Sequence, residues 1–231
     1  MASYMSLTAD FANHVSVKSW AYAEAAIRVN LRTIMAKKDT TSPSLLGGQM
    51  LVAMPGMSDT RFDQSVVYVC VHSDTGAMGI IVNKVAPMMN FGDLVAQLDV
   101  AKGADVPDHV LAMAVLFGGP VEPARGFVLH TTDYFSNDSS LRVTKRIALT
   151  ATIDILRAMA KGEGPQRALL ALGYSGWAPG QLENEIQRNG WLHCPVDEEI
   201  LFGPAHENKY KMALRKIGVD PAMLSSEAGH A

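Results

Sequence analysis

Gly173-Tyr174-Ser175-Gly176-Trp177-Ala178-Pro179-Gly180-Gln181-Leu182-Glu183-Asn184-Glu185-Ile186 is the most informative stretch of the chain. Glycines and a proline surround a tryptophan, and two glutamates come next, where a helix would begin. An ordinary strand or helix has no need of glycines and a tryptophan in this arrangement. We therefore expect a glycine-and-tryptophan corner that leads directly into a helix, with a short apolar strand at 167–172 before it and the helix at 179–189, which has Pro179 near its first turn.

Short β-rich runs bounded by Gly, Pro, Asp or Ser occur along the rest of the chain. They predict strands at 49–53, 65–72, 78–83, 113–117, 126–130 and 191–196. Apolar stripes with helical spacing predict helices at 91–98, 150–161 and 205–217. Strands and helices alternate irregularly, without the regular strand–helix–strand rhythm of a doubly wound sheet, so the sequence favours an α+β fold.

Residues 1–44 differ in character from the rest of the chain. Apolar residues at helical spacing, from Trp20 to Ile34, predict an amphipathic helix at 19–38, and a polar segment ends it. We divide the chain into an N-terminal extension with its linker, 1–44, and a main domain, 45–231. The helix either docks loosely on the domain or binds a membrane surface or a partner.

Composition limits the function classes. The chain has 231 residues, of which 48% are hydrophobic and 19% charged, so it can bury a full core. A net charge of -3 lacks the clustered positive charge of a dedicated DNA-binding protein, which argues against direct nucleic-acid binding. Cys70 and Cys194 are far apart and have no metal-ligand spacing. With no signal-peptide pattern and no apolar run long enough to span a membrane, the expected location is the cytoplasm.

A second special segment runs from Phe117 to His130. It places Gly118, Gly119 and a proline after an apolar strand, and Arg125 before the next strand. Adjacent glycines permit a tight crossover, or they allow backbone N–H groups to cradle an anion with Arg125 as the charge partner. Both interpretations stay open.

Several blocks together resemble the YqgE/AlgH family, in the family's order, over residues 47 to about 217. These blocks are Met54-Pro55-Gly56-Met57-Ser58-Asp59 with Phe62, Ser65-Val66-Val67-Tyr68, Gly76-Ala77-Met78-Gly79 with Asn83, Gly118-Gly119-Pro120-Val121 with Arg125-Gly126-Phe127-Val128-Leu129-His130, Leu172-Gly173-Tyr174 with Trp177, and Gly180-Gln181-Leu182-Glu183 with Glu185-Ile186. The resemblance implies an α+β domain whose mixed sheet curls into a pseudo-barrel flanked by helices. Members of this family are regarded as transcriptional regulators and have no established enzymatic activity, so the resemblance implies a regulatory protein.

The two special segments are the best candidates for a binding cleft, because unusual backbone and ligand-holding side chains concentrate there. We expect the cleft to bind a small anionic or planar ligand, or a protein partner, without a cofactor, a metal ion or a catalytic residue. Trp177 could stack on a planar ligand. The candidate ligand-binding residues are Gly118, Gly119, Arg125, His130, Trp177, Gln181 and Glu183.

Two other function classes remain. An enzyme, either a hydrolase or a cysteine redox sensor, could use His72, His130 or Cys194. A serine nucleophile elbow is disfavoured, because Trp177 stands where Gly-x-Ser-x-Gly needs its last glycine. A DNA-binding regulator is the third hypothesis, although no helix-turn-helix pattern is visible.

Overall fold

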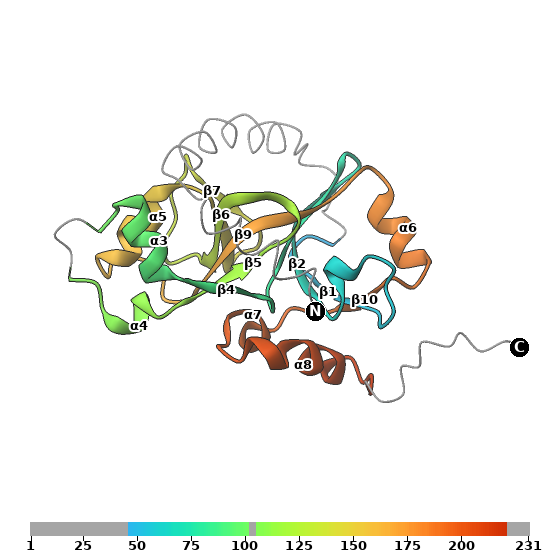
Figure 1. The fold of residues 1–231 in the computed structure, drawn as a ribbon. Helices are drawn as coiled ribbons and strands as arrows, with labels where there is room; N and C mark the ends of the chain where they lie inside the picture. The colour runs from blue at the N-terminus through green and yellow to red at the C-terminus, as the bar shows by residue number, and fades with distance from the viewer. Residues whose placement is uncertain (1–45, 102–104, 221–231) are drawn as a thin grey trace, which may run out of the picture.

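The computed structural model describes residues 46–101 and 105–220 (Figure 1). The helix predicted at 19–38 and the domain boundary at residue 44 lie outside the described residues. The strands are β1 (Met50–Ala53), β2 (Val66–Ser73), β3 (Gly76–Ile81), β4 (Val85–Asn90), β5 (Ala114–Phe117), β6 (Val121–Thr131), β7 (Ser140–Arg142), β8 (Ile147–Thr150), β9 (Ala168–Trp177) and β10 (Trp191–Cys194). The helices are η1 (Thr60–Phe62), α3 (Phe91–Leu98), α4 (Asp108–Leu111), α5 (Ile153–Ala160), α6 (Gln181–Gln187), α7 (Glu198–Phe202), η2 (His206–Asn208) and α8 (Lys209–Lys216).

β9 holds the sheet together. The strand order is β10-β1-β2-β3-β9-β6-β8-β7, with β4 paired to β5. One edge of β9 pairs with antiparallel β6, while along the other edge parallel β5 contacts 170–172 and antiparallel β3 contacts 175–177. The sheet is therefore mixed and curled, and the predicted α+β class is confirmed.

The strand predicted at 167–172 is too short at its C-terminal end. β9 continues through Gly173 and Gly176 to Trp177, and the chain turns only at 178–180 before α6 begins. Gly173 has φ +73°, and a Cβ there would clash with the carbonyl oxygen of Gly119. The glycine thus serves a close approach between two extended segments, and pairing with β3 and β6 keeps the stretch in the sheet.

Three apolar clusters fill the two faces of the sheet. Alternating side chains of β2 show the division, since Val66 and Tyr68 join one cluster while Val67 and Val69 join another. Helices α7 and α8 cover the first cluster, α3 and α5 cover the second, and α6 covers the third. Figure 1 places these three helical groups below the sheet and at its two ends.

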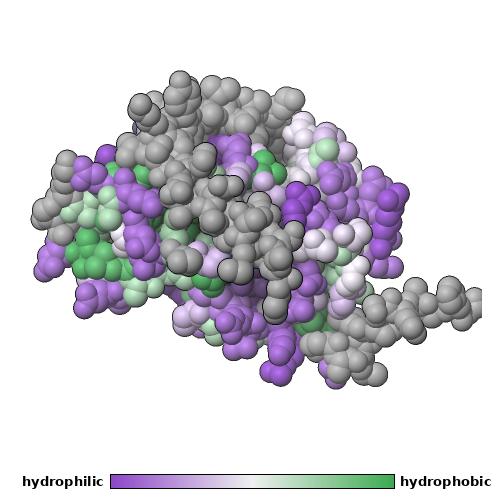
Figure 2. Space-filling model, viewed as in Figure 1, coloured by the Kyte–Doolittle hydropathy of each residue, from purple (hydrophilic) through white to green (hydrophobic). Residues whose placement is uncertain are grey.

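The viewed face of the molecule is uneven in character. Figure 2 shows hydrophilic residues over the end that carries α6, whereas hydrophobic residues gather at the opposite end, near α3 and α4. Within the described ranges, none of the helices has the length and apolar character needed to cross a membrane.

Candidate functional site

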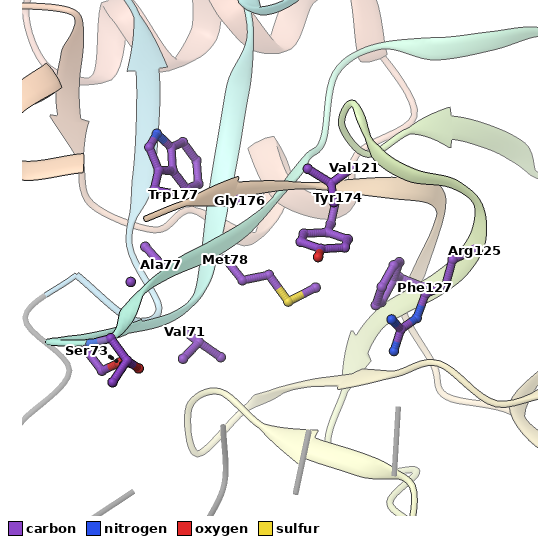
Figure 3. A pocket seen from close by; sticks show the side chains of 12 residues that line it. Val71, Ser73, Ala77, Met78, Val121, Arg125, Phe127, Tyr174, Gly176 and Trp177 are labelled. Atoms are coloured by element: carbon purple, nitrogen blue, oxygen red, sulfur yellow. Dashed lines mark hydrogen bonds between the residues drawn. The ribbon is translucent and has the colours of Figure 1, made fainter. Parts of the chain in front are cut away.

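A cavity of about 360 Å³ opens between the β2–β3 hairpin and β6, on the face of the sheet that α7 and α8 cover elsewhere (Figure 3). Its volume suits a small metabolite. The lining residues are Val71, Ser73, Thr75, Gly76, Ala77, Met78, Val121, Arg125, Phe127, Tyr174, Gly176 and Trp177. Arg125 is the one charged residue among them.

A bulge in β6 brings Arg125 to this cavity. Val121 pairs with Tyr174 and Gly126 pairs with Leu172, so five steps along β6 match only two along β9. The bulge includes Glu122, which has φ +47°, a left-handed conformation that is uncommon for a residue other than glycine. Bulges often re-aim a side chain beside a binding site, and this one directs Arg125.

Arg125 is buried but not fully hydrogen-bonded. Its side chain is 7% exposed, and its Nη1 donates to Oε2 of Glu122 at 2.6 Å. The guanidinium carbon lies 5.1 Å from the ring centroid of Phe127, a cation–π distance. The Nε–H has no partner within the described protein. Buried donors almost always have an acceptor, so this Nε–H is an exception within the described protein.

Aromatic side chains form the wall beside Arg125. The rings of Phe127 and Tyr174 meet edge to face, with centroids 5.8 Å apart. The Tyr174 hydroxyl donates to Oε1 of Glu122 at 3.4 Å. Burial, and then the Glu122 carboxylate, raise the pKa of Tyr174, so the hydroxyl remains a donor at neutral pH. Figure 3 shows the Met78 thioether extending toward this wall.

Trp177 borders the cavity, but its indole ring faces elsewhere. The residue is 6% exposed, and its ring packs with Phe62 and Trp191 in the cluster beneath α6. Figure 3 shows the indole directed away from Tyr174 and Met78. The reason is strand geometry: residues 174 and 177 are an odd number of steps apart and point to opposite faces. The expected stacking of a ligand on Trp177 would require displacement of packed side chains, and Tyr174 is the aromatic residue at the cavity.

Gln181 and Glu183 do not line the cavity. Gln181 accepts from the N–H of Ala178 and donates to Glu185, within the start of α6. Oε1 of Glu183 lies 2.8 Å from Nε2 of His72. These contacts fasten α6 to the sheet.

The two glycines of the β5–β6 connection are in the tight crossover. The N–H of Gly118 donates to the carbonyl of Leu172, and a Cβ on Gly119 would clash with the backbone of Tyr174. The Gly118 N–H is therefore not available to cradle an anion. Arg125 lines the cavity, whereas Gly118 and Gly119 do not.

His130 is away from the cavity and is fully satisfied. It is 0% exposed, its Nδ1–H donates to the carbonyl of Thr131, and its Nε2 accepts from the Thr150 hydroxyl. Thr150 is linked in turn to Ser140 at 2.7 Å. Burial lowers the pKa of His130, so the imidazole is neutral. This arrangement is a structural hydrogen-bond chain.

The residues proposed for an enzyme are also enclosed. Cys70 and Cys194 are free and buried, and burial raises the pKa of each thiol, which disfavours the reactive thiolate. His72 is 5% exposed beneath Glu183. In residues 46–101 and 105–220, no three His, Cys, Asp or Glu side chains are grouped so that they could hold a metal ion.

The structure thus brings Arg125 and Trp177 to one cavity and leaves the other five candidates outside its lining. Sequence reasoning missed the contribution of Glu122, Phe127, Tyr174 and Met78. Phe127 and Tyr174 lie inside the family motifs, next in sequence to Gly126 and Gly173, and Phe127 follows Arg125 by two residues, so the sequence could have singled them out. The size of the β6 bulge could not have been predicted, because it depends on the register between β6 and β9.

Comparisons with known proteins agree over the whole described domain. The sequence model of a family described as AlgH-like matches residues 50–222. A UPF0301 protein of Nitrobacter hamburgensis is 59% identical over 198 residues, covering 84% of this chain and 92% of that protein. A UPF0301 protein of a Methylobacterium species is 56% identical over 210 residues, covering 87% of this chain and 100% of that protein.

Solved structures show the same architecture. The solution structure of the AlgH protein from Pseudomonas aeruginosa, a UPF0301 protein, matches with a TM-score of 0.65 and 38% identity, over 83% of this chain and 98% of that one. A crystal structure from Corynebacterium diphtheriae matches with a TM-score of 0.60 at 21% identity, over 84% of this chain and 95% of that one, and shows the fold alone.

Proposed function

The chain belongs to the AlgH-like family, the YqgE/AlgH type, and we propose that it is a ligand-binding protein of regulatory character and not an enzyme. The ligand is a small molecule with an anionic group on a flat or apolar body. It binds in the cavity between the β2–β3 hairpin and the β6 bulge.

The observation that carries this proposal is the unpartnered Nε–H of Arg125. The guanidinium is buried, charged and held at the cavity by the bulge, yet its Nε–H lacks an acceptor within the described protein. An anionic oxygen would satisfy it, and a hydrogen bond to a charged group contributes about 1.5–3 kcal/mol. Phe127, Tyr174 and Met78 offer the surface for the rest of the ligand.

Other observations support a binding role over the two alternatives. The buried thiols and the satisfied His130 speak against a nucleophile or a proton-transfer group in the described domain. The net charge of -3 speaks against DNA as the direct partner. Two free cysteines fit a reducing cytoplasm, where a regulatory metabolite would be available.

A ligand-observed NMR screen tests the proposal. Small carboxylates, phosphates, sulfonates and uncharged planar compounds are presented to the wild-type protein, and each hit is titrated against Arg125→Gln. We expect hits among the anions, with affinity reduced by about tenfold or more in the variant, since a charge-assisted hydrogen bond is lost.

Arg157→Gln is the matched control, because Arg157 forms an exposed pair with Asp154 at the same three-residue spacing. Amide spectra and melting curves establish that each variant is folded. A second variant, Tyr174→Leu, removes the aromatic wall without touching the charge. If both cavity variants bind every hit as tightly as the wild type does, the cavity is not the binding site and the proposal fails.

A further inference from the structure

A carboxylate of the protein itself already pairs with the cation that lines the cavity. Oε2 of Glu122 accepts from Nη1 of Arg125 at 2.6 Å, and Oε1 accepts from the Tyr174 hydroxyl at 3.4 Å. One carboxyl group therefore bridges the cation and the phenol that line the cavity. The guanidinium of Arg125 and the hydroxyl of Tyr174 thus both donate to a carboxylate within the protein.

Glu122 is placed so that it can leave. Its side chain is 41% exposed, whereas that of Arg125 is 7% exposed. If the pair separates, the carboxylate returns to water, but the guanidinium stays buried and needs a new anion at once. The strained backbone of Glu122, with φ +47°, persists at this point in the bulge, and such strain concentrates at ligand clamps.

We propose that Glu122 is an internal competitor for the ligand, and that the ligand is a small monocarboxylic acid with a flat or apolar body. This inference rests on the proposed function. The ligand's carboxylate takes the place of the Glu122 carboxylate on Arg125, reaches the free Nε–H as well, and lets Glu122 swing into solvent. Arg125 keeps an anionic partner before and after the exchange.

The charge inside the cavity favours a carboxylate over a phosphate. Arg125 is the one charged residue among the cavity's lining residues that the structure describes. A single guanidinium balances one negative charge, and its fork of donors matches the two oxygens of a carboxylate. A phosphate dianion would bring a second charge that no lining side chain neutralises.

Calorimetric titration with three probes tests the exchange: benzoate, its uncharged analogue benzamide, and inorganic phosphate. The proteins are wild type, Glu122→Gln and the control Asp154→Asn, which breaks an exposed Arg–Asp pair of the same spacing. We expect Glu122→Gln to bind benzoate about five- to thirtyfold more tightly, because the competing charge is gone. Asp154→Asn should bind benzoate as the wild type does, and benzamide should bind equally weakly to all three.

The outcomes separate the inference from the proposed function. Unchanged or weaker benzoate binding in Glu122→Gln overturns the inference, while the function stands if anions still lose affinity in Arg125→Gln. Phosphate binding more tightly than benzoate overturns the ligand class. If no probe binds any protein, and no screened compound is sensitive to Arg125→Gln, both proposals fail together. The double variant Glu122→Gln/Arg125→Gln should not show the tighter benzoate binding expected of Glu122→Gln, because that binding depends on Arg125.

Discussion

At the scale of single residues, burial decides the protonation of His130 and Lys209. His130 is enclosed with both ring nitrogens engaged, and Lys209 is 1% exposed with its ammonium bonded to the carbonyls of Val82 and Leu201. Burial lowers the pKa of both groups, and it lowers the pKa of Lys209 to about 8. Each residue therefore couples stability to pH.

Acid should weaken the fold through His130. Its folded-state pKa lies below the unfolded value near 6.5, so the folded protein resists protonation and loses stability as pH falls from about 6.5 toward the folded pKa. Urea unfolding between pH 7.5 and 5 should give a steeper decline in the free energy of unfolding for the wild type than for His130→Gln. His193→Gln, at an exposed position of β10, is the control. Parallel curves for wild type and His130→Gln would contradict this interpretation.

Raising the pH should remove the cost of burying the charged Lys209 ammonium. Below its folded pKa of about 8 the buried ammonium destabilises the folded state, and this cost disappears as pH rises toward the unfolded value of 10.5. The free energy of unfolding of the wild type should gain about 2–3 kcal/mol relative to Lys209→Met between pH 7.5 and 10. The exposed Lys211→Met should leave the wild-type profile intact. A pH-independent difference between wild type and Lys209→Met would show that Lys209 stays charged throughout.

At the scale of elements, one carboxylate fastens α6 to the sheet. Oε2 of Glu185 accepts from the indole N–H of Trp177 at 2.9 Å and from that of Trp191 at 2.8 Å. Its other oxygen accepts from Gln181. Three donors converge on this one side chain, and two of them are indole groups that are largely buried.

Glu185→Gln should loosen α6. An amide offers only one oxygen, so at least one donor loses its acceptor, and the cost is about 1–3 kcal/mol in thermal or urea unfolding. Tryptophan fluorescence should change in position or intensity, because both indoles change environment. The exposed Glu163→Gln serves as the control. An unaltered emission spectrum would mean that packing with Phe62, and not the carboxylate, fixes the indoles.

The elements differ in how far the sequence predicts them. Helix α3 is predicted to the residue, because Asn90 and Asp93 form a capping box before an apolar stripe. Strands β4, β7 and β8 escaped prediction, since β4 contains Pro87 and joins β5 only at its ends, while β7 has three residues. β9 was cut short at its glycines, whose role becomes visible only when the neighbouring backbone is in place.

At the scale of the whole molecule, the candidate site also depends on neighbouring backbone that the sequence does not reveal. Arg125 and Trp177, which lie in two segments distant along the chain, both border the cavity. Which face each side chain takes depends on the β6 bulge and on strand register, which are tertiary facts. His130 illustrates this dependence. It lies at the end of a family motif, yet both of its ring nitrogens are hydrogen-bonded within the protein, to Thr131 and Thr150.

Gly119→Ala tests the crossing that joins the two parts of the sheet. Gly119 has φ +151°, and a Cβ would overlap the backbone of Tyr174 and Ser175, so the variant should lose at least about 2 kcal/mol of stability. Gly162→Ala is matched, because its φ is +74° and nothing lies within 4 Å of the added Cβ. It should cost only about 1 kcal/mol, for the backbone conformation alone. Equal losses in the two variants would argue against a tight crossing.

The central position of β9 has a consequence for biosynthesis. On the ribosome, β3, β5 and β6 emerge long before residues 168–177, so each presents an unsatisfied edge while the nascent chain lengthens. Closure has to wait for the strand that touches all three. Until Trp177 leaves the exit tunnel, these three edges have no partner strand within the nascent chain and are open to pairing with another polypeptide.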